Sequence, residues 1–394
     1  MSKNADSYDS PGHRAWRRVV VKVGTNLLTA GSDRLSPEAI ETIAHQIADL
    51  RRSGIEVVLV TSGAVAAGQA LLNGRGGSLP RHGVANRQVL AALGQSSLMA
   101  EYSKCFEREG FLAAQALVSR TDLESDHGYL NTRNALLGLI QAGAIPVVNE
   151  NDVVAIEELE GDVFGDNDRL SARVADVVDA DTLVILSDVD GLYDRDPHLG
   201  DGAVRIPEVR HISPEIRAAA GLAGTERSRG GMATKVDAAE IATRIGTSVI
   251  IASGTEPDVL MRLSNGEDLG TRFPAGASRL ESRKRRILAT LRADSGRVVV
   301  NAGAASALLQ RGSSLLPPGI LSVSGQFERG TNIAVCDEGG TVIAAGRSNY
   351  SSADVEKIKG LRSGEARGIV DNDYGDEVIH RNNLVLVDRD SDRD

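Results

Sequence analysis

The chain has little of several residue types, and each shortage excludes a class of protein. Only 2 of its 394 residues are cysteines, Cys105 and Cys336, and they lack the spacing of a metal site. Aromatic residues make up 3% of the chain, so stacking platforms for nucleic-acid bases are scarce. A net charge of −10 also disfavours nonspecific binding to nucleic acid. We therefore expect a protein of a reducing, cytoplasmic compartment and not a disulfide-stabilised one.

Long hydrophobic runs are also missing. The longest largely apolar stretch, residues 135–148, is too short to span a bilayer and contains Gln141 and Pro146. Residues 1–15 have no apolar core, so we interpret them as a disordered extension and not as a signal peptide. Residues 389–394 are expected to form a disordered tail. We predict no association with membranes.

What the chain does contain is a regular alternation of strand and helix signals between residues 18 and 260. The expected strands are continuously aliphatic, and amphipathic helical patterns separate them. They cover residues 19–23, 55–60, 112–118, 145–148, 182–186 and 248–251. Such strands are typical of a parallel sheet that is buried on both faces. The pattern predicts an α/β domain over residues 16–275, with a mostly parallel sheet sandwiched by helices.

The pattern changes after residue 275. Short strand signals separated by glycine turns predict a small β-rich domain, a barrel, over residues 291–388. We interpret residues 276–290 as a linker and their basic run Arg283–Arg286 as a solvated segment or an inter-domain salt-bridge patch; a nucleic-acid site is the alternative. Residues 291–394 hold 12 Lys or Arg against 15 Asp or Glu, a net charge of −3. This balance favours a structural or regulatory role for the domain and disfavours RNA as a partner.

The first candidate site is Lys22, which interrupts a run of valines at the end of the first predicted strand. A buried ammonium needs an anion, and Gly24 lets backbone N–H groups approach that anion closely. This combination suggests phosphate handling. A solvated lysine at a strand end is the alternative.

Two further loops follow predicted strands and carry polar side chains. Ser62 and Gly63 precede a helix whose N-terminus could bind a carboxylate or a phosphate, although an ordinary strand-to-helix turn has the same pattern. The segments 149–152 and 165–169 offer acceptors for an ammonium and donors for a carboxylate, which suits a zwitterionic amino acid. A helix N-cap and turn chemistry are the alternative for them. A calcium loop is disfavoured because the ligand order of an EF-hand is missing.

The fourth candidate site consists of two segments, residues 187–193 and residues 228–235. A double glycine that opens a helix, with Lys235 one turn later, resembles a cradle for nucleotide phosphates. No Gly-Lys dipeptide, no G-x-G-x-x-G and no H-R-D loop occurs, which excludes a Walker A loop, a dinucleotide fingerprint and a protein kinase.

Taken together, these motifs resemble those of one known family. They are V-V-K-V-G-T-N, V-T-S-G-A-V-A-A-G, A-L-G-Q-S, P-V-V-N-E-N-D, G-D-N-D, S-D-V-D-G-L-Y, G-G-M-A-T-K and R-G-S-S-L-L-P-P-G-I. In this order the chain resembles the bacterial glutamate 5-kinases of the amino-acid-kinase superfamily, many of which carry a C-terminal PUA domain. The match extends from about residue 18 to residue 387. One departure is Ser228-Arg229, where the family usually has Gly-Thr.

The resemblance implies phosphorylation of the γ-carboxylate of L-glutamate by ATP with Mg²⁺, the first step of proline synthesis. It also implies feedback inhibition by proline and assembly into dimers or tetramers. Carried over by position, Ser62, Asp152 and Asn167 would bind glutamate. The ATP-binding set would be Lys22, Gly24, Ser187, Asp188, Arg229, Gly230, Gly231, Met232, Ala233, Thr234 and Lys235.

We expect Lys22 and Lys235 to flank the path of the transferred phosphoryl group, with Asp168 holding both ammonium groups in position. No general base is expected, because a γ-carboxylate is already ionised at neutral pH. Two alternatives stay open. The acceptor could be acetylglutamate, aspartate, carbamate or UMP, or the chain could be an RNA-binding or regulatory protein on a retired kinase fold.

Overall fold

The computed structural model describes residues 16–81, 83–154, 167–195, 202–222, 231–276, 279–291, 296–366, 368–370 and 374–387. Contacts divide the chain into two compact units, residues 1–120 with 133–277 and residues 121–132 with 278–394. The predicted extension 1–15 and tail 389–394 lie outside the described residues. The predicted domain bounds 16–275, 276–290 and 291–388 stay predictions.

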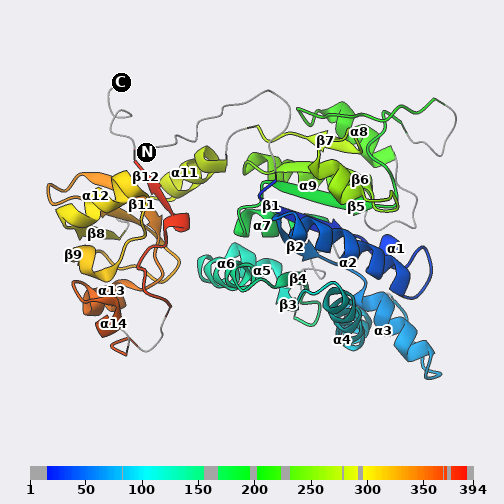
Figure 1. Cartoon of the computed structure of the whole chain (residues 1–394), viewed down its shortest axis with the longest axis horizontal. Coiled ribbons are helices and arrows are strands. Elements are labelled where there is room, and N and C mark those ends of the chain that lie inside the picture. The colour runs from blue at the N-terminus through cyan, green and yellow to red at the C-terminus, as the bar shows by residue number, and fades with distance from the viewer. Residues whose placement is uncertain are drawn as a thin grey trace. The chain divides into compact units, whose positions relative to one another are not determined.

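The first unit is built on a seven-stranded sheet with the order β3-β4-β2-β1-β5-β6-β7 (Figure 1). Its strands are β1 (Arg18–Val23), β2 (Glu56–Val60), β3 (Ala113–Val118), β4 (Ile145–Glu150), β5 (Thr182–Ser187), β6 (Ser248–Ser253) and β7 (Thr271–Phe273). All neighbours pair in parallel except β6 and β7, which are antiparallel. The predicted mostly parallel sheet is confirmed. The short edge strand β7 was not predicted, because three residues carry too little periodicity.

Helices connect these strands along the chain. They are α1 (Thr25–Leu28), α2 (Pro37–Arg52), α3 (Ala64–Asn73), α4 (Val84–Arg108), α5 (Arg120–Glu124), α6 (Asp126–Gln141), α7 (Asn167–Val177), α8 (Pro214–Leu222), α9 (Met232–Arg244) and α10 (Val259–Ser264). The hydroxyl of Ser36 accepts the Ala39 N–H and caps α2, as expected for Ser before Pro at a helix start. Within the described residues, no helix is long and apolar enough to cross a membrane.

The alternation of side chains along β1 places Lys22. Val19, Val21 and Val23 join the core that β1 forms with α2, α4 and α10. Successive strand residues point to opposite faces, so Lys22 lies on the other face of the sheet, where α7 packs against β1 and α9 packs against α7. The strand therefore directs one charged side chain toward α7 and α9 while its odd-numbered valines form the core.

The helices α3 and α4 approach each other through glycines. A Cβ atom on Gly94 would lie 1.9 Å from the Ala64 carbonyl oxygen, and one on Gly68 would lie 1.9 Å from the Leu90 carbonyl oxygen. Only residues without a side chain allow this backbone contact. It fixes the position of α4, which borders the functional site described below.

The second unit has its own five-stranded sheet with the order β12-β11-β10-β8-β9 (Figure 1). Its strands are β8 (Arg297–Val300), β9 (Ile320–Ser324), β10 (Asn332–Cys336), β11 (Val342–Arg347) and β12 (Leu384–Leu386), and its helices include α11 (Arg279–Thr290), α12 (Ala302–Arg311), α13 (Ser352–Ile358) and α14 (Ser363–Ala366). Apolar side chains of these elements form a separate core. The basic run Arg283–Arg286 lies in α11, within the residues predicted as a linker.

Candidate active site

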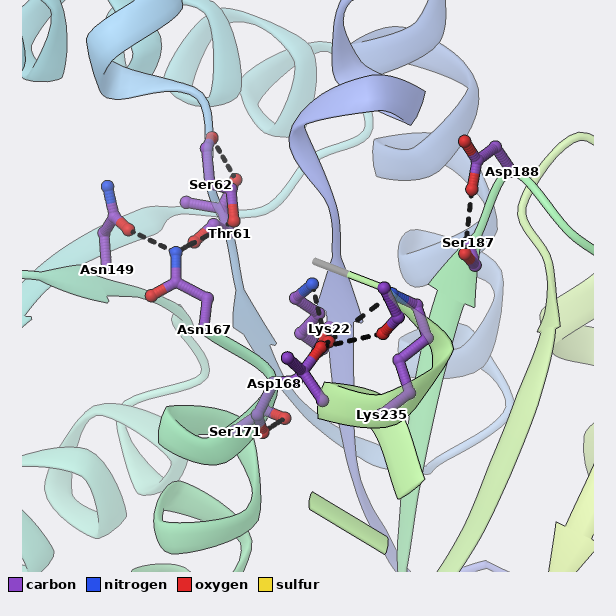
Figure 2. A network of polar contacts seen from close by, with 12 residues as sticks. Lys22, Thr61, Ser62, Asn149, Asn167, Asp168, Ser171, Ser187, Asp188 and Lys235 are labelled. Atoms are coloured by element: carbon purple, nitrogen blue, oxygen red, sulfur yellow. Dashed lines mark hydrogen bonds and ion pairs between the residues drawn. The ribbon is translucent and has the colours of Figure 1, made fainter. Parts of the chain in front are cut away.

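Two lysines from distant parts of the chain meet at one buried carboxylate. Lys22 Nζ lies 2.5 Å from Asp168 Oδ1, and Lys235 Nζ lies 3.4 Å from Asp168 Oδ2 (Figure 2). The Thr234 hydroxyl lies 2.8 Å from the same Oδ2 as a donor. Asp168 is 1% exposed and the lysines are 5% and 6% exposed. The three charged groups therefore form one buried cluster between β1, α7 and α9.

Burial and the neighbouring charges shift the pKa values of Asp168 and Lys235. Burial alone would raise the pKa of Asp168, yet the ammonium groups of Lys22 and Lys235 hold it below its ordinary value. Burial lowers the pKa of Lys235, with Lys22 adding to the effect and Asp168 opposing it. Asp168 stands in the first turn of α7, where the helix dipole favours a negative charge. Asp168 thus stays ionised and compensates one of the two nearby positive charges.

A cavity of about 350 Å³ opens beside the cluster, at the carboxyl ends of β1, β2, β4 and β5. The strand order reverses around β1, and open α/β sheets bind their ligands at such a point. The cavity is lined by Lys22, Gly24, Thr25, Asn26, Leu27, Ser62, Gly63, Ala64, Val65, Ala66, Arg81, Arg87, Asn149, Glu150, Asp152, Asn167, Leu186, Ser187, Asp188 and Lys235. Four of these residues are basic (Lys22, Arg81, Arg87 and Lys235) and three are acidic (Glu150, Asp152 and Asp188), so the lining has a formal excess of one positive charge although the whole chain is acidic.

The N-terminus of α3 contributes further donors to the cavity. Gly63 has φ +101°, a left-handed conformation that favours glycine, and it turns the chain from β2 into α3. The first residues of α3 line the cavity, and backbone N–H groups at a helix start bind carboxylate or phosphate oxygens.

A set of amide side chains forms the wall opposite Asp188. Asn167 Nδ2 lies 2.7 Å from the Thr61 carbonyl oxygen, 2.8 Å from the Ser62 hydroxyl oxygen and 3.1 Å from Asn149 Oδ1. Its two N–H groups therefore serve three acceptors, and one of these hydrogen bonds is bifurcated. Asn149 Nδ2 donates in turn to Gln95 Oε1 at 2.8 Å. These bonds tie β2, β4, α4 and α7 together at the cavity.

Asp188 is held on the other side of the cavity. Its Oδ2 accepts from Asn26 Nδ2 at 3.0 Å, and its Oδ1 accepts from the Ser187 hydroxyl at 3.0 Å. Burial would raise the pKa of Asp188, but these two hydrogen bonds keep it below its ordinary value. In contrast, burial raises the pKa of Asp152 above its ordinary value, although the charge of Arg87 acts in the opposite direction.

The structure brings most of the residues predicted for the site to this cavity. Eight of them line it, namely Lys22, Gly24, Ser62, Asp152, Asn167, Ser187, Asp188 and Lys235. Asp168 lies behind the two lysines. Gly231, Met232, Ala233 and Thr234 are not among the lining residues, and the predicted ATP-binding residues Arg229 and Gly230 lie outside the described residues.

Sequence reasoning missed several residues of the site. Arg81 and Arg87 line the cavity, but no motif pointed to them. Asn26 belongs to the motif V-V-K-V-G-T-N, but no role was predicted for it. Its hydrogen bond to Asp188 joins two segments that are far apart in the sequence, so neither segment alone predicts it. Gln95 belongs to the motif A-L-G-Q-S, which was a signal of resemblance only.

The part of the chain that the structure describes contains no group of three or more His, Cys, Asp or Glu side chains that could hold a metal ion. Mg²⁺ does not need such a group, since in kinase sites it is held by one or two carboxylates together with substrate phosphates and water. The cavity, with Asp188 in the predicted ATP-binding set, fits a metal that arrives with a nucleotide.

Comparisons with known proteins identify the family of the chain. Residues 17–253 match the model of the amino acid kinase family, and residues 296–370 match the PUA domain. The glutamate 5-kinase of Herpetosiphon aurantiacus is 47% identical over 368 residues, which cover 93% of this chain and 98% of that one. The glutamate 5-kinase of Dehalococcoides mccartyi strain CBDB1 is 44% identical, with 94% and 99% covered. That of Deinococcus radiodurans is 46% identical, with 94% and 100% covered. The chain therefore belongs to the amino acid kinase family and, within it, to the glutamate 5-kinases, and it carries a PUA domain.

Proposed function

We propose that the chain transfers the γ-phosphoryl group of ATP to the γ-carboxylate of L-glutamate, which yields L-glutamyl 5-phosphate, the first intermediate of proline synthesis. One observation carries the proposal: Lys22 and Lys235 meet at Asp168 beside a cavity with positive charge. The names of the relatives give the acceptor, and their similarity covers nearly the whole chain.

The reaction needs positioning and charge stabilisation more than acid–base chemistry. A γ-carboxylate oxygen attacks the γ-phosphorus, a new O–P bond forms, and the bond from that phosphorus to the β–γ bridging oxygen breaks, which releases ADP. The nucleophile is ionised at neutral pH, so no proton must be removed. The difficulty is to bring one anion onto another and to stabilise the charge of the transferred group.

Lys22 and Lys235 supply this stabilisation. Their ammonium groups line the cavity while Asp168 holds both from behind, so they do not need to reorient during the reaction. Backbone N–H groups near Gly24 and at the start of α3 would add donors to the anionic groups. When bound with ATP, Mg²⁺ would neutralise part of the charge on the phosphate oxygens.

We assign Ser62, Asp152 and Asn167 to glutamate. The carboxylate of Asp152 suits the α-ammonium group, while the hydroxyl of Ser62 and the donors around it suit a carboxylate. We assign Ser187, Asp188 and residues 229–235 to ATP. Feedback inhibition by proline, assembly into dimers or tetramers, a cytoplasmic location and a structural or regulatory role of the PUA domain are further parts of this proposal.

The test is a hydroxylamine trapping assay. The purified chain is incubated with ATP, Mg²⁺ and hydroxylamine, and γ-glutamyl hydroxamate is measured with L-glutamate as the acceptor. Acetylglutamate, aspartate, carbamate and UMP are offered in parallel, with ADP release as the common readout. Product with glutamate alone supports the proposal. Turnover with another acceptor in place of glutamate would reject it. Absence of turnover with every acceptor, together with tight RNA binding, would also reject it.

A further inference from the structure

The amide side chains beside the cavity form a chain of hydrogen bonds with a defined direction (Figure 2). Gln95 of α4 accepts from Asn149, Asn149 accepts from Asn167, and Asn167 donates to the hydroxyl of Ser62. The four residues come from α4, β4, α7 and the loop after β2, so these hydrogen bonds link four parts of the fold beside the cavity.

Two backbone groups fix this direction. The Thr61 carbonyl can only accept, so Asn167 must turn its Nδ2 toward it, at 2.7 Å. The Glu150 backbone N–H can only donate, and it reaches Asn149 Oδ1 at 2.9 Å. With Oδ1 facing both Glu150 and Asn167, Asn149 must present Nδ2 on its other side. Position 95 must therefore supply an acceptor, and Gln95 Oε1 does so at 2.8 Å.

The direction of these hydrogen bonds determines whether the Ser62 hydroxyl can donate to a ligand. The Ser62 oxygen accepts from Asn167 Nδ2, so its own proton is available for another partner. Ser62 lines the cavity, where an anionic ligand offers such a partner. Reversal of the amides would place Asn167 Oδ1 against the Thr61 carbonyl and turn the Ser62 hydroxyl back into the wall.

We propose that Gln95 is a positioning residue for the amino-acid substrate: the two backbone groups set which way the amides face, and Gln95, as the terminal acceptor, holds the Asn149 side chain in place, so that Asn167 keeps its Nδ2 at Ser62 and leaves the Ser62 hydroxyl to donate to a substrate carboxylate. The proposal deepens the proposed function and rests on it. Only the acceptor half of the amide is used, because Gln95 Nε2 is buried without a hydrogen-bond partner within the described part of the chain. The requirement at position 95 is thus an acceptor oxygen and not an amide as such.

The experiment compares Gln95→Met, which removes the acceptor at similar volume, with Gln95→Glu, which keeps it. We expect Gln95→Met to raise both the KM and the dissociation constant for L-glutamate by roughly tenfold, the loss typical of one hydrogen bond to a charged group. The KM for ATP should change by less than about twofold, because the substitution alters no residue that we assign to ATP binding. Gln95→Glu should restore most of the affinity for glutamate. Gln95→Lys, which offers only donors, should behave like Gln95→Met.

Gln141→Met is the matched control, since Gln141 is an exposed glutamine at the end of α6. It should leave both KM values unchanged. An unchanged glutamate affinity in Gln95→Met, an equal effect on both substrates, or a Gln95→Glu variant as weak as Gln95→Met would overturn the inference. Glutamate binding is also titrated without ATP. A wild-type chain that binds glutamate but forms no hydroxamate would reject the proposed function, while the titration would still decide the role of Gln95.

Discussion

At the residue scale, the arrangement of three buried charges is the central feature. A buried ion costs several kcal/mol unless it is paired, and pairs replaced by apolar residues are often as stable. Lys22, Asp168 and Lys235 are therefore not explained by stability. Two positive charges share one carboxylate, which leaves a net positive charge at the edge of the cavity. That excess suits an anionic ligand.

Removal of either ammonium should slow turnover. We expect Lys22→Ala and Lys235→Ala each to lower kcat by ~10²–10³, the effect seen when one preorganised electrostatic stabiliser is deleted. Steady-state kinetics with saturating ATP and glutamate measures it. Lys104→Ala, at an exposed position of α4, is the control and should retain wild-type turnover. Near-native kcat in either active-site variant contradicts the assignment.

The raised pKa of Asp152 predicts a pH effect on glutamate binding. Above that pKa the carboxylate is charged and can hold the α-ammonium group, and the attraction is lost as the pH falls through it. We expect kcat/KM for glutamate to fall on the acid side, beginning above the pH at which an ordinary aspartate titrates. The measurement is kcat/KM for glutamate and for ATP from about pH 5 to pH 8, a range that lies above the ordinary pKa of an aspartate.

Asp152→Asn is the matched variant for this profile. This variant should bind glutamate weakly, and its kcat/KM for glutamate should not fall on the acid side of the pH profile. Its KM for ATP should stay nearly unchanged. The same acid limb in Asp152→Asn would show that another group titrates.

At the element scale, α4 connects the core to the site. Its apolar side chains Leu98, Tyr102 and Phe106 pack in the core, and Gln95 reaches the amide chain one turn earlier. The close contact with α3 sets how far α4 can move, because Gly94 and Gly68 leave no room for a Cβ atom. Packing of two helices thus positions a side chain at the cavity.

The substitution Gly94→Ala should destabilise the chain. Its Cβ would lie 1.9 Å from the Ala64 carbonyl oxygen, so α3 and α4 must separate, at a cost of about 1–3 kcal/mol. Gly138→Ala in α6 is the control, because apart from its chain neighbours and the adjacent backbone of its own helix no atom of the described residues lies within 4 Å of its Cβ position. There we expect a gain of about 0.5–1 kcal/mol from the helix preference of alanine. Thermal or urea unfolding measures both, and equal stability of the two variants would argue against the close contact.

At the scale of the whole molecule, two units each have their own sheet and core. Every residue that lines the ligand cavity belongs to the first unit. A ligand that binds the folded first unit stabilises that unit by mass action.

We therefore expect calorimetry to show separable transitions. A nonhydrolysable ATP analogue with Mg²⁺ and glutamate, at about 100 times their dissociation constants, should each stabilise the first unit by about 2.7 kcal/mol. The transition of the second unit should not move. Lys22→Ala serves as the control for the nucleotide shift. A shift of both transitions together would mean that the units unfold as one.

The sequence by itself determined the six parallel strands, the longer helices between them and the loops that carry the site, while the short helices α1, α5, α8 and α10 were not predicted. Aliphatic runs, helix caps and glycine turns are local signals, and each is contained in a short segment. The same segments supplied Lys22, Ser62, Asp152, Asn167, Asp168, Asp188 and Lys235 as candidates, largely through their resemblance to one family.

The tertiary structure decided which of these side chains meet. Thr234 donates to Asp168, Asn26 donates to Asp188, and Asn149 donates to Gln95. The partners in these hydrogen bonds are 54 to 162 residues apart in the sequence. Arg87 lies in α4 and Arg81 lies in the loop before it, so their place at the cavity depends on how α4 packs against α3. Hydrogen-bond direction and charge sharing arise between elements, so no periodicity within one element can report them.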